Sequence, residues 1–135
     1  MSRSGYSDDG DGLNLYRGNV ANAIRGKRGQ AFLRDLARAM DAMPVKELIA
    51  DNLIDADGNC CAIGVVCKQQ NIDVSDIDYN SPHDVGDAVN IAWQLAAEIE
   101  YENDEASRWD ETRQMRWQRM REWVNRQLTA EGQEK

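Results

Sequence analysis

The feature that most constrains the fold of this 135-residue chain is a tight turn set between two apolar runs. Apolar residues are frequent in 48–54, the sequence Asp55-Ala56-Asp57-Gly58 follows, and a second apolar run covers residues 60–67. An Asp-Gly pair favours a two-residue hairpin turn, because glycine accepts the positive φ that such turns require. The pattern predicts a two-stranded β-hairpin whose second run becomes a buried helix over residues 62–70.

Helical periodicity dominates the rest of the chain. Apolar residues recur on one helical face in residues 13–24, 30–43, 82–103 and 110–128. Pro44 ends the second of these segments, and Ser81-Pro82 starts the third with an N-cap residue and a proline at the first helical position.

A two-stranded hairpin is marginally stable alone in water, so helices must cover one face of it. We therefore expect an α+β fold: one mostly helical domain over residues 13–128, with four to five helices around the hairpin and the 82–103 helix at its centre. Residues 1–12 and 129–135 have little to bury and are predicted to be a flexible arm and a flexible tail.

Charge is distributed unevenly along the chain. The net charge is −8, yet residues 13–46 hold seven Lys/Arg against two Asp/Glu, residues 47–106 hold one against fourteen, and residues 107–135 hold seven against five. The total argues against a strongly cationic nucleic-acid binder. The acidic segment suits a basic protein partner, although such a run can also be a solvated face. Its candidate contact residues are Asp84, Asp87, Glu98, Glu102 and Glu105.

Carboxylates crowd the C-terminal end of the predicted 82–103 helix, where the helix dipole disfavours negative charge. A cationic group is therefore expected nearby. The arginines of residues 110–128 suit this role, with the tryptophans of that segment in the core. Alternatively, Trp109, Trp117 and Trp123 stack bases while the arginines bind phosphates.

A second basic candidate is Gly26-Lys27-Arg28-Gly29, just before a predicted helix. Free N–H groups at a helix N-terminus can bind an anion, but we favour the plainer interpretation of this segment as a basic turn between helices. The residues of a nucleic-acid surface would be Arg25, Lys27, Arg28, Arg34, Arg38, Arg113, Arg116 and Arg119.

No pattern indicates catalysis or a bound metal. The acidic turn fails as an EF-hand, because Leu53 and Gly64 would occupy ligand positions. Cys60, Cys61, Cys67 and the lone His83 lack the spacing of a zinc site, and buried free cysteine is the commoner role. No base lies beside a nucleophile in a recognisable pattern. We expect a non-enzymatic protein without cofactor or metal, its cysteines reduced.

Three segments resemble small uncharacterised proteins encoded by tailed phages and prophages. They are residues 23–33 (AIRGKRGQAFL), residues 60–65 (CCAIGV) and residues 101–105 (YENDE) followed by the Trp/Arg segment. The resemblance implies a phage or prophage origin and no particular activity.

From charge and resemblance together we expect an accessory protein that binds a host protein complex, including defence complexes it would antagonise. The alternative is a nucleic-acid-binding regulator that uses the basic residues. With no apolar run near the ~20 residues of a membrane helix and no signal-peptide core, we expect no membrane partner and a location in the host cytoplasm. Self-association stays open.

Overall fold

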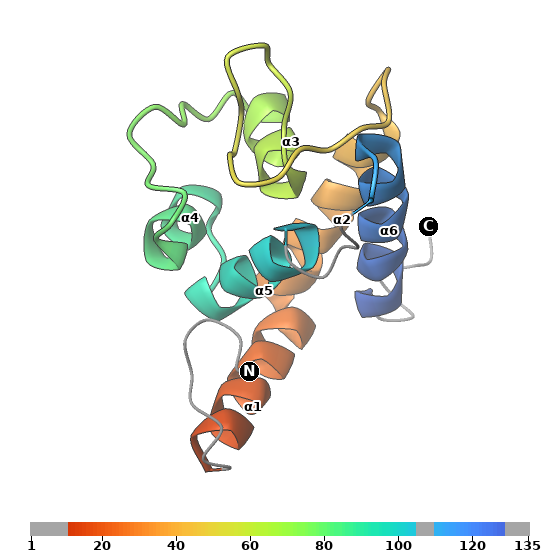
Figure 1. The fold of residues 1–135 in the computed structure, drawn as a ribbon. Coiled ribbons are helices and arrows are strands. Elements are labelled where there is room, and N and C mark those ends of the chain that lie inside the picture. The colour runs from red at the N-terminus through yellow and green to blue at the C-terminus, as the bar shows by residue number, and fades with distance from the viewer. Residues whose placement is uncertain (1–10, 105–109, 129–135) are drawn as a thin grey trace.

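The computed structural model describes residues 11–104 and 110–128. In these ranges the secondary structure is helical, and Figure 1 shows α5 at the centre between α4 and α6. The prediction of an α+β fold is therefore wrong for the described residues. The flexible ends were expected at residues 1–12 and 129–135. Of these residues the structure describes only 11 and 12, which belong to the first helix. The helices are α1 (Asp11–Arg25), α2 (Lys27–Asp41), α3 (Ala62–Gln69), α4 (Pro82–Val89), α5 (Trp93–Asp104) and α6 (Arg113–Gln127).

The predicted hairpin is reduced to a single antiparallel bridge between Ile54 and Cys60, with no strand among the described residues. The turn itself forms: Gly58 has a φ of 84°, and the Asp55 N–H donates to the Asn59 carbonyl at 2.9 Å. A ladder cannot continue because Cys61 becomes the N-cap of α3 and its Sγ accepts the Gly64 N–H. The chain therefore enters a helix directly after one bridge.

The long helix predicted over residues 82–103 is broken in two. Asn90 adopts the left-handed conformation, with φ 62° and ψ 46°, and its N–H bonds the Gly86 carbonyl. Asparagine tolerates this conformation better than most residues. The next N–H, of Ile91, also bonds Gly86 at 2.9 Å, so α4 closes tightly before α5 begins at Trp93. This kink at Asn90 sets the geometry of the site described below.

The core is built where α2, α3, α5 and α6 meet. The loop before α3 approaches this helix closely, because a Cβ on Gly64 would lie 1.9 Å from the Leu53 carbonyl oxygen. All three cysteines are buried free thiols within the core, and burial raises the pKa of Cys67 to about 11. The largest fully buried side chains of these helices are Leu33, Leu36, Met40, Ile63, Val66, Leu95, Ile99, Met120 and Val124.

Arginines of α6 lie against the C-terminal end of α5. Arg116 Nε donates to the Asn103 carbonyl at 3.0 Å, and an Arg119 Nη donates to the same carbonyl at 3.2 Å. Arg119 also forms a two-point ion pair with Glu111, whose side chain is only 5% exposed. The cationic group expected at the end of the acidic helix is thus supplied from within the fold.

Two glycines offer a matched test of the packing. Gly64→Ala is expected to destabilise the protein by about 3 kcal/mol, because a methyl group would overlap the Leu53 backbone oxygen. Gly18→Ala, on α1 with nothing within 4 Å, is expected to stabilise it by about 0.5–1 kcal/mol. Urea unfolding measures both. Equal effects of the two substitutions would contradict the close approach of α3 to residue 53.

Removal of the Arg119 side chain is expected to cost about 2–4 kcal/mol of unfolding free energy, because Glu111 and the last carbonyls of α5 lose their donors. Arg126→Ala is the control, since Arg126 is exposed on the same helix and should change stability by less than about 0.5 kcal/mol. Thermal or denaturant unfolding reports both values. A loss no greater for Arg119 than for Arg126 would show that the α5–α6 contact is not stabilising.

Candidate functional site

The kink at Asn90 folds the start of α4 back against α5. The rings of His83 and Trp93 stack with their centroids 4.8 Å apart. In a continuous helix, ten residues would separate these two positions by ~15 Å along the axis. Between the two helices lies a cavity of about 450 Å³, which we call the α4–α5 pocket.

Carboxylates and aromatic rings dominate the wall of the α4–α5 pocket. Asp51, Glu100 and Asp104 supply the carboxylates, and no Lys or Arg is among the described residues that line it. The Tyr79 hydroxyl donates a hydrogen bond to Asp104. Burial raises the pKa of Tyr79 far above its usual value, so the phenol keeps its proton. The remaining lining residues are Tyr79, Asn80, Pro82, His83, Trp93, Ala97 and Tyr101.

Glu100 carries the most perturbed carboxyl of the pocket. Burial, and secondarily the charge of Asp104, raises its pKa to about 8. One of its oxygens is buried and accepts no hydrogen bond from the part of the chain that the structure describes. A buried acceptor without a donor costs about 1–3 kcal/mol, so the site would gain from a ligand that donates hydrogen bonds or brings positive charge.

Exposed aspartates lie on the loop before α4 and on α4 itself, close in sequence to residues 79–83 of the pocket lining. We call residues 72–90 the acidic lobe. Residues 69–104 contain no lysine or arginine, and within the described ranges none of the lobe's aspartates forms an ion pair. The lobe therefore presents negative charge that no ion pair offsets in the described ranges, although Arg28 donates to its Asn90 side chain. Its exposed carboxylates are Asp73, Asp76, Asp78, Asp84 and Asp87.

The acidic residues proposed from the sequence do not form one surface. Asp84 and Asp87 are exposed on α4, as a partner contact requires. Glu98 is only 5% exposed and cannot lie on a binding surface. Glu102 is half-buried on α5, and Glu105 lies outside the described residues.

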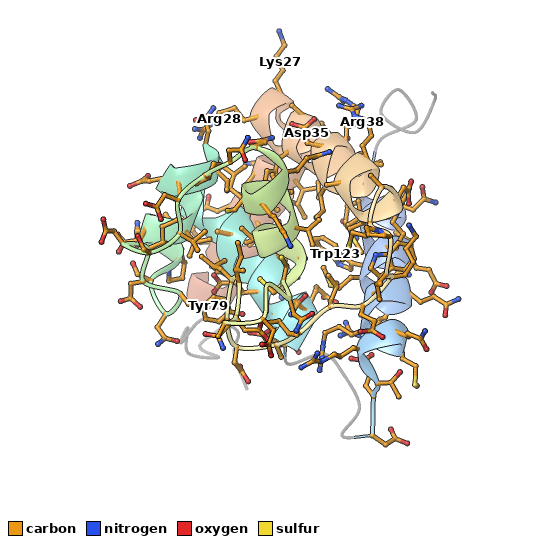
Figure 2. All side chains as sticks on the ribbon, turned by 90° about the horizontal axis from the view of Figure 1, so that it is seen from above. Lys27, Arg28, Asp35, Arg38, Tyr79 and Trp123 are labelled. Atoms are coloured by element: carbon orange, nitrogen blue, oxygen red, sulfur yellow. The ribbon has the colours of Figure 1, made fainter. Side chains whose placement is uncertain are left out.

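The basic residues are also divided. Arg25, Lys27 and Arg28 are exposed at the junction of α1 and α2, and Arg28 donates to the Asn90 side chain at 3.1 Å. Figure 2 shows Lys27, Arg28 and Arg38 along one edge of the molecule, away from Tyr79.

Several of the other candidate cations already form contacts within the fold. Arg38 pairs with Asp35 at 2.7 Å, Arg34 is half-buried, and Arg113 is exposed. Arg116 and Arg119 are engaged with Glu111 and α5, so they are poorly placed for nucleic acid.

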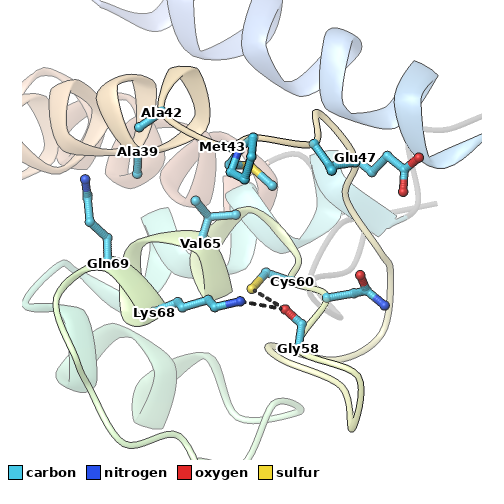
Figure 3. A pocket seen from close by; sticks show the side chains of 12 residues that line it. Ala39, Ala42, Met43, Glu47, Gly58, Cys60, Val65, Lys68 and Gln69 are labelled. Atoms are coloured by element: carbon cyan, nitrogen blue, oxygen red, sulfur yellow. Dashed lines mark hydrogen bonds between the residues drawn. The ribbon is translucent and has the colours of Figure 1, made fainter.

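A second cavity, of about 340 Å³, lies between the end of α2 and α3. Figure 3 shows Cys60 Sγ and Lys68 Nζ both bonded to the Gly58 carbonyl, at 3.6 and 3.1 Å. Burial raises the pKa of Cys60, which makes it a poor nucleophile. This cavity has mostly apolar walls, and its two charged lining residues, Glu47 and Lys68, are of opposite sign.

Among the described residues, no group of three or more His, Cys, Asp or Glu is arranged to hold a metal ion. In the same ranges, no helix is both long and apolar enough to cross a bilayer. His83 stacks on Trp93 and faces a pocket of carboxylates. The sequence did not indicate this pocket; its one available signal was the long stretch without lysine or arginine.

The pKa of Glu100 predicts a specific pH dependence. Because its pKa is about 8 when folded and near 4.5 when unfolded, the folded state retains a proton that the unfolded chain releases between these values. Stability should therefore fall as pH rises from 5 to 8, by about 2 kcal/mol after allowance for partial exposure. Glu100→Gln should remove this contribution.

Denaturant unfolding at several pH values measures the effect. Asp87→Asn, at an exposed carboxylate of α4, is the matched control. Its unfolding free energy should change with pH as that of the wild type does. If the unfolding free energy of Glu100→Gln fell with pH as steeply as that of the wild type, Glu100 would not be the group responsible.

No protein-family model, curated protein or solved structure matches this chain. The resemblance to phage and prophage proteins therefore stays a prediction. The candidate site is defined by the residues that line the α4–α5 pocket and by the acidic lobe around it.

Proposed function

We propose that this chain is a non-enzymatic accessory protein of a tailed phage or prophage that binds a basic surface of a host protein complex. The single observation that carries the proposal is the acidic lobe, whose exposed aspartates form no ion pair with the described residues. The phage setting rests on the three segments that resemble phage proteins. Antagonism of a host defence complex is the outcome of binding that we favour.

The physical basis is charge complementarity. Exposed carboxylates that repel one another are relieved by a cationic partner, and complementary potentials raise the association rate and exclude acidic competitors. Elsewhere the chain compensates its own charges: Arg121 pairs with Asp41 at 2.9 Å and lowers the pKa of that carboxyl. Among the described residues, Asp41 is ion-paired and the aspartates of the acidic lobe are not, and this difference supports the lobe as the surface that binds a partner.

A nucleic-acid-binding regulator is the second candidate. It is supported by Arg25, Lys27 and Arg28, which are exposed around the N-terminus of α2. Binding of this kind would weaken steeply with salt, because phosphate contacts release counterions. Nuclease treatment of a captured complex separates the two candidates.

Charge reversal within the acidic lobe is expected to weaken partner binding. The tagged chain captures its partner from a lysate of a phage-susceptible bacterium, and the double variant Asp76→Lys/Asp87→Lys should lower the captured amount by about tenfold, equivalent to about 1.4 kcal/mol. The control is Asp57→Lys/Glu122→Lys, which reverses two exposed carboxylates outside the lobe and changes the net charge equally.

Mass spectrometry with and without nuclease completes this measurement. A partner that survives nuclease and is lost only in the lobe variant is the expected result. Equal losses in both double variants would point to net charge alone, and partners that vanish with nuclease would favour the nucleic-acid candidate.

A further inference from the structure

We infer that the α4–α5 pocket binds an organic cation, the guanidinium or ammonium end of an arginine or lysine side chain supplied by the basic partner. This inference rests on the proposed function and assigns a specific chemistry to the centre of its surface. The observation behind it is a pocket of about 450 Å³ whose walls combine three carboxyl side chains with aromatic rings.

The pocket is large enough to admit such a side chain. It lies between the start of α4 and the face of α5 that carries Trp93, Glu100 and Tyr101. The stacked pair of His83 and Trp93 forms one wall. Aromatic faces attract cations through the ring quadrupole, and the attraction grows when the cation is desolvated.

Glu100 supplies an observation independent of pocket shape. Its buried oxygen accepts no hydrogen bond from residues 11–104 or 110–128. Its raised pKa is caused by burial and by the charge of Asp104, with no cation among the described residues to offset them. An arginine or lysine head group would supply both the missing donor and the missing charge.

The alternatives within the same cavity fit less well. A phosphate or other anion would meet Asp51, Glu100 and Asp104 without a lysine or arginine in the described lining. A purely apolar ligand would leave the Glu100 oxygen unsatisfied. A metal ion lacks a cluster of ligands in the described ranges. The chemistry of the walls therefore selects an organic cation.

The pocket also lies beside the acidic lobe. Asn80, Pro82 and His83 belong both to the lobe and to the pocket lining. A basic segment drawn to the exposed aspartates would thus be positioned to insert one side chain between α4 and α5. Buried anchor residues surrounded by weaker rim contacts are the usual arrangement of protein interfaces.

The test is an NMR titration of the ¹⁵N-labelled full chain at constant ionic strength. The probes are a Gly-Arg-Gly peptide, the same peptide with citrulline as a neutral isostere of arginine, and spermidine. We expect the arginine peptide to shift the Trp93 indole and Tyr101 amide signals saturably. We expect the citrulline peptide to bind about tenfold more weakly.

Variants locate the effect. Glu100→Gln should weaken arginine-peptide binding by about fivefold or more, whereas Asp57→Asn, at an exposed carboxylate outside the lobe and the pocket, should leave it within about twofold. Equal binding of the arginine and citrulline peptides would overturn the inference, and this comparison needs no variant to fold. Tighter binding of spermidine than of the arginine peptide would also overturn it, because the pocket would then belong to a free polyamine.

The two proposals can fail separately. Partner capture that depends on the acidic lobe, together with no saturable binding of the arginine peptide, overturns the pocket assignment alone. Saturable binding at Trp93 and Tyr101 without any lobe-dependent partner upholds the pocket chemistry and removes the proposed function.

Discussion

The hydrogen bonds of Asn103, near the C-terminal end of α5, are the interactions on which the rest of the structure depends. Its buried side chain accepts the Ala62 N–H at 3.1 Å and donates to the Ile49 carbonyl at 2.9 Å. Its own carbonyl receives Arg116 and Arg119 from α6. One residue thus joins the start of α3, the loop before it, α5 and α6. Because an unsatisfied buried polar group costs about 1–3 kcal/mol, these bonds fix where the acidic end of α5 lies.

The two ends of α5 differ in how their charges are neutralised. At the C-terminal end of α5 the arginines of α6 pair with Glu111 and donate to the last backbone carbonyls of α5, which offsets the helix dipole within the fold. Beyond the kink at Asn90, the aspartates of α4 and of its preceding loop form no ion pair with the described residues. The uncompensated charge and the perturbed carboxyl of Glu100 then meet in the same region. A partner with cationic side chains would supply the positive charge that these carboxyl groups lack.

The local patterns of the sequence predicted helices well and tertiary geometry less well. Residues 30–43 and 110–128 were expected to be helical and correspond to α2 and α6, because their apolar stripes and end signals agree. The hairpin failed because Cys61 caps a helix instead of extending a strand. The central helix was expected to be continuous because apolar residues recur on both sides of Asn90, and only the backbone reveals its left-handed conformation. The pocket could not be predicted for the same reason, since that kink alone brings His83 to Trp93.

The most direct test of the central claim is hydrogen exchange of the chain alone and in complex with its captured partner. The account predicts slower exchange in residues 72–101, where the acidic lobe and the pocket lie, with little change at the α1–α2 junction. Protection confined to residues 25–38 would contradict it, because the partner would then bind the basic edge and leave the acidic lobe in solvent.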